Sequence, residues 1–114
     1  MIRLPDWSCN WDKHSTPVDV KFRTNGRITD GCLSITVEDV RYENFATVVH
    51  DPLCGSPIEN FSHCEVRVVL PGSTVLDEPP PNAKKKDSAA SKDARHRWRR
   101  HIRNRLKVVI IAQA

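Results

Sequence analysis

Short apolar stretches, each closed by turn-forming residues, follow one another through residues 17–78. The first, at 18–22, alternates apolar and polar residues, which is typical of a half-buried strand. Asn25-Gly26 follows, and because both residues tolerate positive φ, the pair predicts a tight hairpin. A longer strand is predicted over 27–37, with a sharp bend at Gly31.

Three further strands are predicted at 45–49, 65–70 and 74–76. A polar stretch at 38–44 is expected to turn the chain before the first of them, and Pro71-Gly72-Ser73 separates the last two. About five short strands in roughly 60 residues cannot form two packed sheets with a core, whereas a closed sheet leaves fewer exposed edges. We therefore expect a mainly β fold, a small and strongly bent five-stranded barrel.

A helical pattern follows the predicted barrel. The prolines at 79–81 predict a stiff, extended linker. Beyond it, apolar residues spaced four apart indicate an amphipathic helix, and they are Ala94, Trp98, Ile102 and Leu106. Ser88 or Ser91 can cap its N-terminus. Its end stays open, since Asn104 can stop the helix and leave 106–112 as a strand, or the helix can continue.

The length of 114 residues fits one domain with short additions. We expect an N-terminal lead-in at 1–16, a barrel at 17–78, a Pro/Lys-rich linker at 79–87, and a basic helix with an apolar end at 88–114. In the lead-in, Trp7 and Trp11 are four residues apart, so they would share one face of a short helix. An irregular lead-in is the alternative.

The net charge of +4 is unevenly divided along the chain. Residues 1–80 carry seven Lys and Arg against twelve Asp and Glu, while residues 81–114 carry eleven against two. An acidic body with a basic tail favours an anionic partner for the tail, such as nucleic acid. A solvated tail or a nuclear-import signal is the alternative interpretation.

The sequence lacks the signals that identify several functional classes. No apolar run reaches the length of about 18 residues that a membrane span needs, and the N-terminus has no apolar signal-peptide core, so we expect an intracellular protein with reduced thiols. A zinc site from His50, Cys54, His63 and Cys64 is disfavoured, because the adjacent His63 and Cys64 would point to opposite faces of a strand. No acid–base pair or catalytic nucleophile is visible, so we expect neither an enzyme nor a cofactor.

The order of these segments resembles the Sm and Sm-like (LSm) protein family. The strand at 18–22, the hairpin Asn25-Gly26 and the sequence Gly31-Cys32-Leu33 resemble the first Sm motif. Tyr42-Glu43-Asn44 is similar to the aromatic-Met-Asn segment of the family, and 68–75 is similar to the second Sm motif. The segment 75–81 is similar to the tail of B-type spliceosomal Sm subunits.

The resemblance implies a subunit of a hetero-oligomeric ring. Strands at about 64–70 and 74–78 would pair with neighbouring Sm or Sm-like subunits, which removes exposed sheet edges. The ring would hold a uridine-rich, single-stranded segment of small nuclear RNA in the core of a spliceosomal snRNP that takes part in mRNA splicing. The implied location is the nucleus, with assembly in the cytoplasm possible.

The resemblance also implies the RNA-binding residues. Tyr42 would stack on a base, Asn44 would read the base edge, and Gly72 would complete the pocket. The basic helix would hold phosphates through Arg95, Arg99 and Arg103. Pro71 stands where the family has an RNA-contacting arginine, which Arg41 or Arg67 would have to replace. The alternative is an Sm-fold protein-assembly subunit that has lost direct RNA binding.

Overall fold

The computed structural model describes residues 7–16, 31–54, 60–83 and 85–110. The strand and hairpin predicted at 18–26 lie outside these residues. The elements, in chain order, are β1 (Trp7–Asn10), β2 (Cys32–Ser34), α2 (Val37–Val40), the 3-10 turn η1 (Tyr42–Asn44), β3 (Ala46–His50), β4 (His63–Val68), the 3-10 turn η2 (Lys85–Asp87), α3 (Lys92–Arg105) and β5 (Lys107–Ile110).

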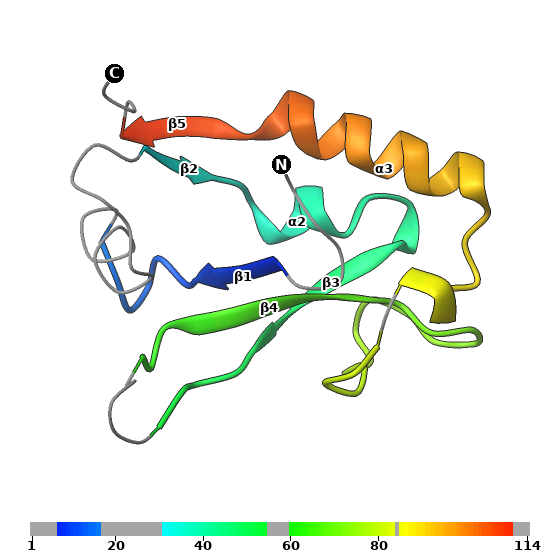
Figure 1. The fold of residues 1–114 in the computed structure, drawn as a ribbon, viewed down its shortest axis with the longest axis horizontal. Helices are drawn as coiled ribbons and strands as arrows, with labels where there is room; N and C mark the ends of the chain where they lie inside the picture. Colours follow the sequence, from blue (N-terminus) through cyan, green and yellow to red (C-terminus); the bar gives the residue numbers. More distant parts are fainter. Residues whose placement is uncertain (1–6, 17–30, 55–59, 84, 111–114) are drawn as a thin grey trace.

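The larger sheet is antiparallel and has the order β1-β4-β3 (Figure 1). Cys9 of β1 lies opposite Cys64 of β4, and Val48 of β3 lies opposite Val66 of β4. The alternation of apolar residues in the sequence therefore predicted β3 and β4 within one or two residues of their observed ends.

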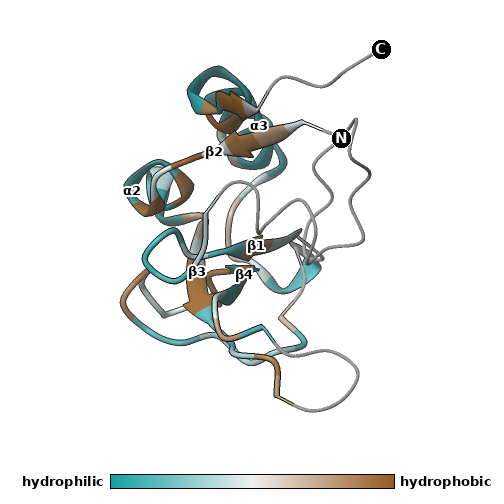
Figure 2. Ribbon diagram, turned by 90° about the vertical axis from the view of Figure 1, so that its left-hand side faces the viewer, coloured by the Kyte–Doolittle hydropathy of each residue, from teal (hydrophilic) through white to brown (hydrophobic). Residues whose placement is uncertain are grey.

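One face of this sheet forms the floor of the hydrophobic core. Ala46, Val66 and Val68 are fully buried on it, and they share the face because alternate residues of a strand point the same way. Figure 2 shows the hydrophobic stretches of β3 and β4 below a mostly hydrophilic α3. The rest of the buried cluster comes from other segments, namely Val40, Phe45, Ala83, Trp98 and Ile102.

The segment after β4 crosses the opposite face of the sheet. The Thr47 hydroxyl donates to the carbonyl of Val75 at 2.9 Å. The Arg67 guanidinium donates to the carbonyl of Pro79 at 3.0 Å. Pro79 is itself buried, so the proline-rich stretch packs on the sheet at its first residue, while Pro80 and Pro81 are exposed.

A short helix replaces the polar turn that was expected at 38–44. Thr36 caps α2, because its hydroxyl accepts a hydrogen bond from the Asp39 backbone N–H at 3.1 Å. The acidic residues of the first turn suit the positive end of the helix dipole. Val40, at the end of α2, is buried in the core, and this long-range packing favours the helix over an open turn.

The basic C-terminal helix is confirmed as α3. Ser91 is its N-cap, and the Ser91 hydroxyl accepts from the Ala94 N–H at 3.1 Å. Trp98 and Ile102 are fully buried, and the Trp98 indole N–H donates to the carbonyl of Val40 at 2.7 Å. The helix ends at Arg105 and leads into β5, so the strand alternative for the last segment holds over 107–110.

The prediction of a mainly β barrel is wrong. The described residues form a mixed α/β fold with one three-stranded sheet and a separate pair, β2 and β5, and no sheet in this part of the chain closes into a barrel. The long strand predicted over 27–37 is described only from residue 31, and there β2 ends at Ser34 before α2 begins. The chain enters α2 where a barrel needs a continuous strand.

The two segments predicted as exposed ring edges have other structures. Strand β4 is the middle strand of its sheet, so β1 and β3 already pair with its two edges. Residues 74–78 form turns and bends instead of a strand. The Thr74 N–H donates to the Asp77 carboxylate at 2.7 Å, and this bond closes the turn. The side chain of Leu76, which was counted as a strand residue, is 83% exposed.

The N-terminal lead-in also differs from the prediction. Residues 7–10 form β1 on the edge of the larger sheet, so Trp7 and Trp11 do not share a helix face. The Trp11 N–H donates to the carbonyl of Ser62 at 2.7 Å and extends the pairing with β4. No helix in the described part of the chain is long and apolar enough to cross a membrane.

Candidate nucleic-acid interface

Helix α3 presents two flanks with different electrostatic surroundings. One flank faces α2 and η1, which supply carboxylates to it. The Arg97 Nε atom lies 3.0 Å from the Glu43 carboxylate, and the His101 Nε2 atom lies 3.1 Å from the Asp39 carboxylate. The two carboxylates offset positive charge on this side of the helix, which we call the paired flank (Arg97, His101 and Arg105).

Asp39 is the electrostatic centre of the paired flank. The hydrogen bond from the Thr36 hydroxyl lowers the pKa of the Asp39 carboxyl, and the His101 hydrogen bond and the nearby charge of Arg105 lower it further. Arg105 therefore belongs to the paired flank although it is at the end of the helix. The carboxylate is ionised at neutral pH and offsets the cations around it.

The other flank of α3 carries cations without such partners. At about 100° per residue, positions 95, 99 and 103 fall on the side away from the paired flank. Position 95 is nearest the buried line of Trp98 and Ile102, and position 103 is nearest the most exposed line of the helix. Among the residues that the structure describes, no carboxylate lies within ion-pair distance of these arginines. We call this the outer flank, and its members are Lys92, Arg95, Arg99, Arg100 and Arg103.

The outer flank is fixed to the body of the protein. The indole of Trp98 and the side chain of Ile102, which lie between the two flanks, anchor α3 in the core. Lys92, Arg100 and Arg103 are exposed, and Arg95 and Arg99 are half-buried. A rigid row of cations loses less conformational entropy on binding a phosphate backbone than a flexible tail does.

Tyr42, the predicted base-stacking residue, is already stacked. Its ring lies 3.9 Å from the His101 ring, centroid to centroid, at an interplanar angle of 5°. The side chain is half-buried and packs against the core cluster. One face of the ring is therefore occupied within the protein, and its base-stacking role stays a prediction.

Asn44, the predicted base reader, uses both ends of its amide inside the protein. Its NH₂ group donates to the carbonyl of Ser73 at 3.3 Å, and its carbonyl oxygen accepts from the Val75 N–H at 2.9 Å. These two bonds hold the turn that contains Gly72, whose φ of 79° suits glycine. Asn44, in η1, thus binds the loop that contains Gly72, while Arg95, Arg99 and Arg103 lie on α3.

The two arginines considered as replacements for Pro71 have structural partners. The Arg41 Nε atom donates to the Thr47 hydroxyl at 3.2 Å. Arg67 is buried, and its guanidinium lies within 4.0 Å of carboxylates from Asp51, Glu65 and Glu78. A guanidinium held by three carboxylates does not serve as a free phosphate ligand.

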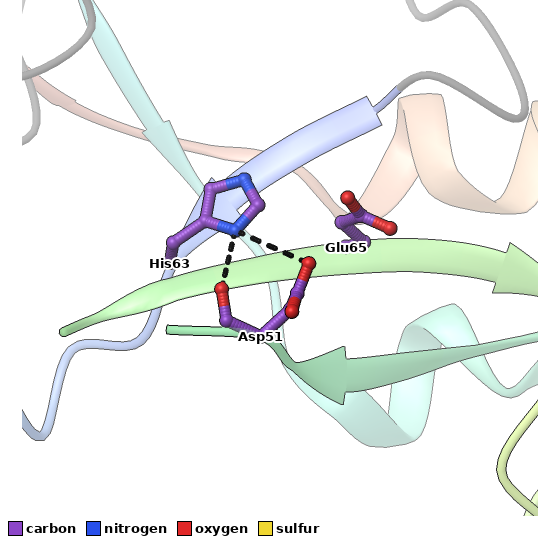
Figure 3. A group of neighbouring side chains, drawn as sticks. All are labelled: Asp51, His63 and Glu65. Carbon is purple, nitrogen blue, oxygen red and sulfur yellow. Dashed lines mark hydrogen bonds and ion pairs between the residues drawn. The ribbon is translucent and has the colours of Figure 1, made fainter. Parts of the chain in front are cut away.

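A group of possible metal ligands lies on the polar face of the larger sheet (Figure 3). Asp51, His63 and Glu65 place one ligand atom each within 4.8 Å of one another. However, the His63 Nδ1 atom is 2.7 Å from the Asp51 backbone carbonyl, so this nitrogen carries a proton. The Arg67 guanidinium occupies the Glu65 carboxylate at 3.0 Å. These contacts form an internal ion-pair cluster and do not favour a cation.

The four residues of the disfavoured zinc site, His50, Cys54, His63 and Cys64, do not form a ligand group in the structure either. Asp51, His63 and Glu65 are the only potential metal-ligand group found in the described ranges, and it contains no cysteine. The thiol of Cys64 is buried and donates to the carbonyl of Ser62, while Cys54 is exposed. His50 binds the carbonyl of Phe61.

The difference between the two flanks is not visible in the sequence alone. Arg95, Arg99 and Arg103 were predicted as phosphate ligands from the density of basic residues on one helix, and their role stays a prediction. Lys92 and Arg100 were not among the predicted site residues. The missed signal was the acidic character of 38–43, which contains three carboxylates. Only the fold places two of those carboxylates against α3.

No family model, no curated protein and no solved structure matches this chain.

Proposed function

We propose that the protein binds single-stranded RNA through the outer flank of α3. The observation that supports this most directly is the row of five cations without carboxylate partners in the described residues, set on a helix that is anchored through buried Trp98. Cations that neutralise phosphates supply most of the affinity of sequence-independent binding, and their effect depends on salt.

The direction of approach follows from the paired flank. Glu43 and Asp39 are negative groups beside Arg97 and His101, so a phosphate backbone meets less favourable electrostatics on that side. On the outer flank, the Lys and Arg side chains are positive and the acidic residue of the described part of α3 is Asp93, at its first turn. The RNA backbone therefore follows the outer flank along the helix.

The matched test compares two double variants on the same helix. Arg99→Gln with Arg103→Gln removes two outer-flank cations, and Arg97→Gln with Arg105→Gln removes two paired-flank cations. Both lower the net charge equally. Binding of a labelled oligouridine is followed by fluorescence anisotropy over a series of salt concentrations, and thermal unfolding checks that each variant is folded.

The outer-flank variant is expected to bind several-fold more weakly, with the log–log salt slope flattened by about 1.4, or about 0.7 for each lost phosphate contact. The paired-flank variant is expected to keep most of the affinity and the slope. Equal losses in both variants would mean that only total charge matters. Unchanged binding in both would exclude RNA contact by α3 and leave nuclear import or partner docking.

The second candidate is a protein-assembly role without RNA binding. It is favoured by the β2–β5 pair, where Leu33 and Val108 lie opposite each other and are 55% and 63% exposed. The Leu33→Ser with Val108→Ser variant tests it by analytical ultracentrifugation at high concentration. Membership of an Sm-like ring, a spliceosomal particle and a nuclear location stay predictions, and the observed β4 pairing gives the ring model no free edge there.

A further inference from the structure

Two of the four cysteines face each other across neighbouring strands. Cys9 of β1 and Cys64 of β4 are direct register partners, and both are free thiols. Directly opposite residues in an antiparallel pair project from the same face of the sheet. Here that face is the core face, because Cys64 is buried beside Val66 in the alternation of β4 and Cys9 packs against the core cluster.

The backbone geometry places the pair within reach of a disulfide. The Trp11 N–H bonds to the Ser62 carbonyl, and hydrogen-bonded pairs alternate along a ladder, so Cys9 and Cys64 form a hydrogen-bonded pair as well. Such pairs have Cα atoms about 5.5 Å apart, inside the range of about 4.4–6.8 Å for disulfides. The Cβ atoms must approach by about 1 Å, which strains the bond and makes it readily reducible.

The two thiols are not equally accessible. Cys64 is 4% exposed, and its thiol donates to the Ser62 carbonyl. Cys9 is half-buried, so an external reagent reaches Cys9 first. Burial raises the pKa of Cys9 to about 12, and the adjacent Cys64 adds to this. The thiolate fraction of Cys9 is therefore small at neutral pH and rises about tenfold with each pH unit.

We propose that Cys9 and Cys64 are a reversible disulfide site that reacts with a low-molecular-weight disulfide such as glutathione disulfide. The Cys9 thiolate attacks one sulfur of glutathione disulfide, the S–S bond breaks, and one glutathione leaves and takes up a proton. The Cys64 thiolate then attacks the Cys9 sulfur, and the second glutathione leaves in the same way. The protein loses two electrons and two protons, and two glutathione thiols gain them.

The bridge would fasten β1 to the centre of the larger sheet. Strand β1 has four residues and pairs only with β4 in the described part of the fold. Cross-linking residues 9 and 64 closes a long loop and restricts the unfolded chain, which raises the melting temperature as far as strain allows. This inference is independent of RNA binding by α3.

The test uses the full chain with Cys32→Ser and Cys54→Ser, which leaves only the proposed pair. Cys32 lies on β2 in the other sheet and Cys54 is exposed in the loop after β3, so neither replacement removes a core side chain. The protein is incubated with glutathione disulfide at several pH values. Intact mass, free-thiol titration and peptide mapping are then measured before and after dithiothreitol.

We expect the loss of both thiols and of the mass of two hydrogen atoms, a mapped Cys9–Cys64 peptide, a rate that rises with pH, and full reversal by dithiothreitol. The additional Cys64→Ser change is expected to stop the reaction at a stable glutathione adduct on Cys9. A stable adduct without the Cys64→Ser change, or thiols that react only after urea unfolding, would overturn the proposal. Wild-type protein that forms a different cysteine pair would overturn it as well.

Discussion

Replacement of Trp98 tests the anchoring of α3 on the body of the protein. The indole is fully buried, packs 5.2 Å from the Phe45 ring by centroids, and donates its N–H to the carbonyl of Val40. A buried tryptophan removes about 150–250 Å² from water, which at about 25 cal/mol per Å² is an upper limit of about 4–6 kcal/mol. Measured truncations of this kind cost about 3–5 kcal/mol.

The predicted effects separate packing from hydrogen bonding. Trp98→Ala is expected to lower the free energy of unfolding by about 3–5 kcal/mol, a large part of the total of a small domain. Trp98→Phe keeps a ring in the core but leaves the Val40 carbonyl without its indole donor, so we expect a smaller loss of about 1–3 kcal/mol. Trp11→Phe is the control, because Trp11 is 39% exposed, and surface changes shift stability by about 0.5 kcal/mol or less.

Urea denaturation followed by far-ultraviolet circular dichroism measures these differences, with a common m-value required for the comparison. The order of loss should be Trp98→Ala, then Trp98→Phe, then Trp11→Phe. A Trp98→Ala variant as stable as the Trp11→Phe control would refute the docking of α3 on this core. Equal losses for Trp98→Ala and Trp98→Phe would refute the partition between ring packing and the bond to Val40.

Two further predictions concern the turn and the paired flank. Asn44→Ala removes both amide bonds to the 73–75 turn. We therefore expect a loss of stability of about 1–2 kcal/mol in urea denaturation with unchanged oligouridine affinity. Weaker binding at unchanged stability would contradict this and support Asn44 as a base reader. Asp39 has a lowered pKa in the folded protein, so its contribution to stability is present above the unfolded pKa and is lost as pH falls through the folded value. Asp39→Asn should therefore give a shallower acid loss of stability than the wild type, and parallel pH curves would contradict this.

Local signals predicted the elements whose stabilising contacts are close in sequence. The Ser91 cap and the four-residue apolar spacing define α3 within one stretch of chain. The alternation that identifies β3 and β4 is equally local. The polar residues at 38–44 predict a turn because they do not reveal the contact that stabilises α2. That contact joins Val40 to Trp98, which lies 58 positions further along the chain.

Two other predictions, the strand at 74–76 and the lead-in at 7–10, were wrong for different physical reasons. The apolar residues at 74–76 suggested a strand, but the Asp77 carboxylate binds the Thr74 N–H and closes a turn there. The four residues of β1 are too few to show the apolar–polar alternation of a strand, so the sequence predicts only a lead-in there. The partner strand β4, which determines the structure of β1, lies more than 50 positions away. Once β1 occupies one edge of β4, a ring contact through that edge needs a strand to be displaced.

The acidic and basic regions that are separate in the sequence partly lie against each other in the fold. Counted along the chain, the acidic body and the basic tail are separate regions. In the structure, Glu43 and Asp39 of the body lie against Arg97 and His101 of the tail. Part of the positive charge therefore serves to orient α3, in pairs whose exposed members add little stability each.

The positive charge that remains available to a partner is therefore smaller than the number of Lys and Arg residues in the tail suggests. It also lies on one side of α3. Arg95, Arg99 and Arg103 lie along one side of a helix whose adjacent, buried side is fixed by Trp98 and Ile102. In the proposed binding mode, an RNA strand follows this row along the helix axis, because the carboxylates of the paired flank disfavour contact on the other side. In that mode the acidic residues of the body orient the RNA without touching it.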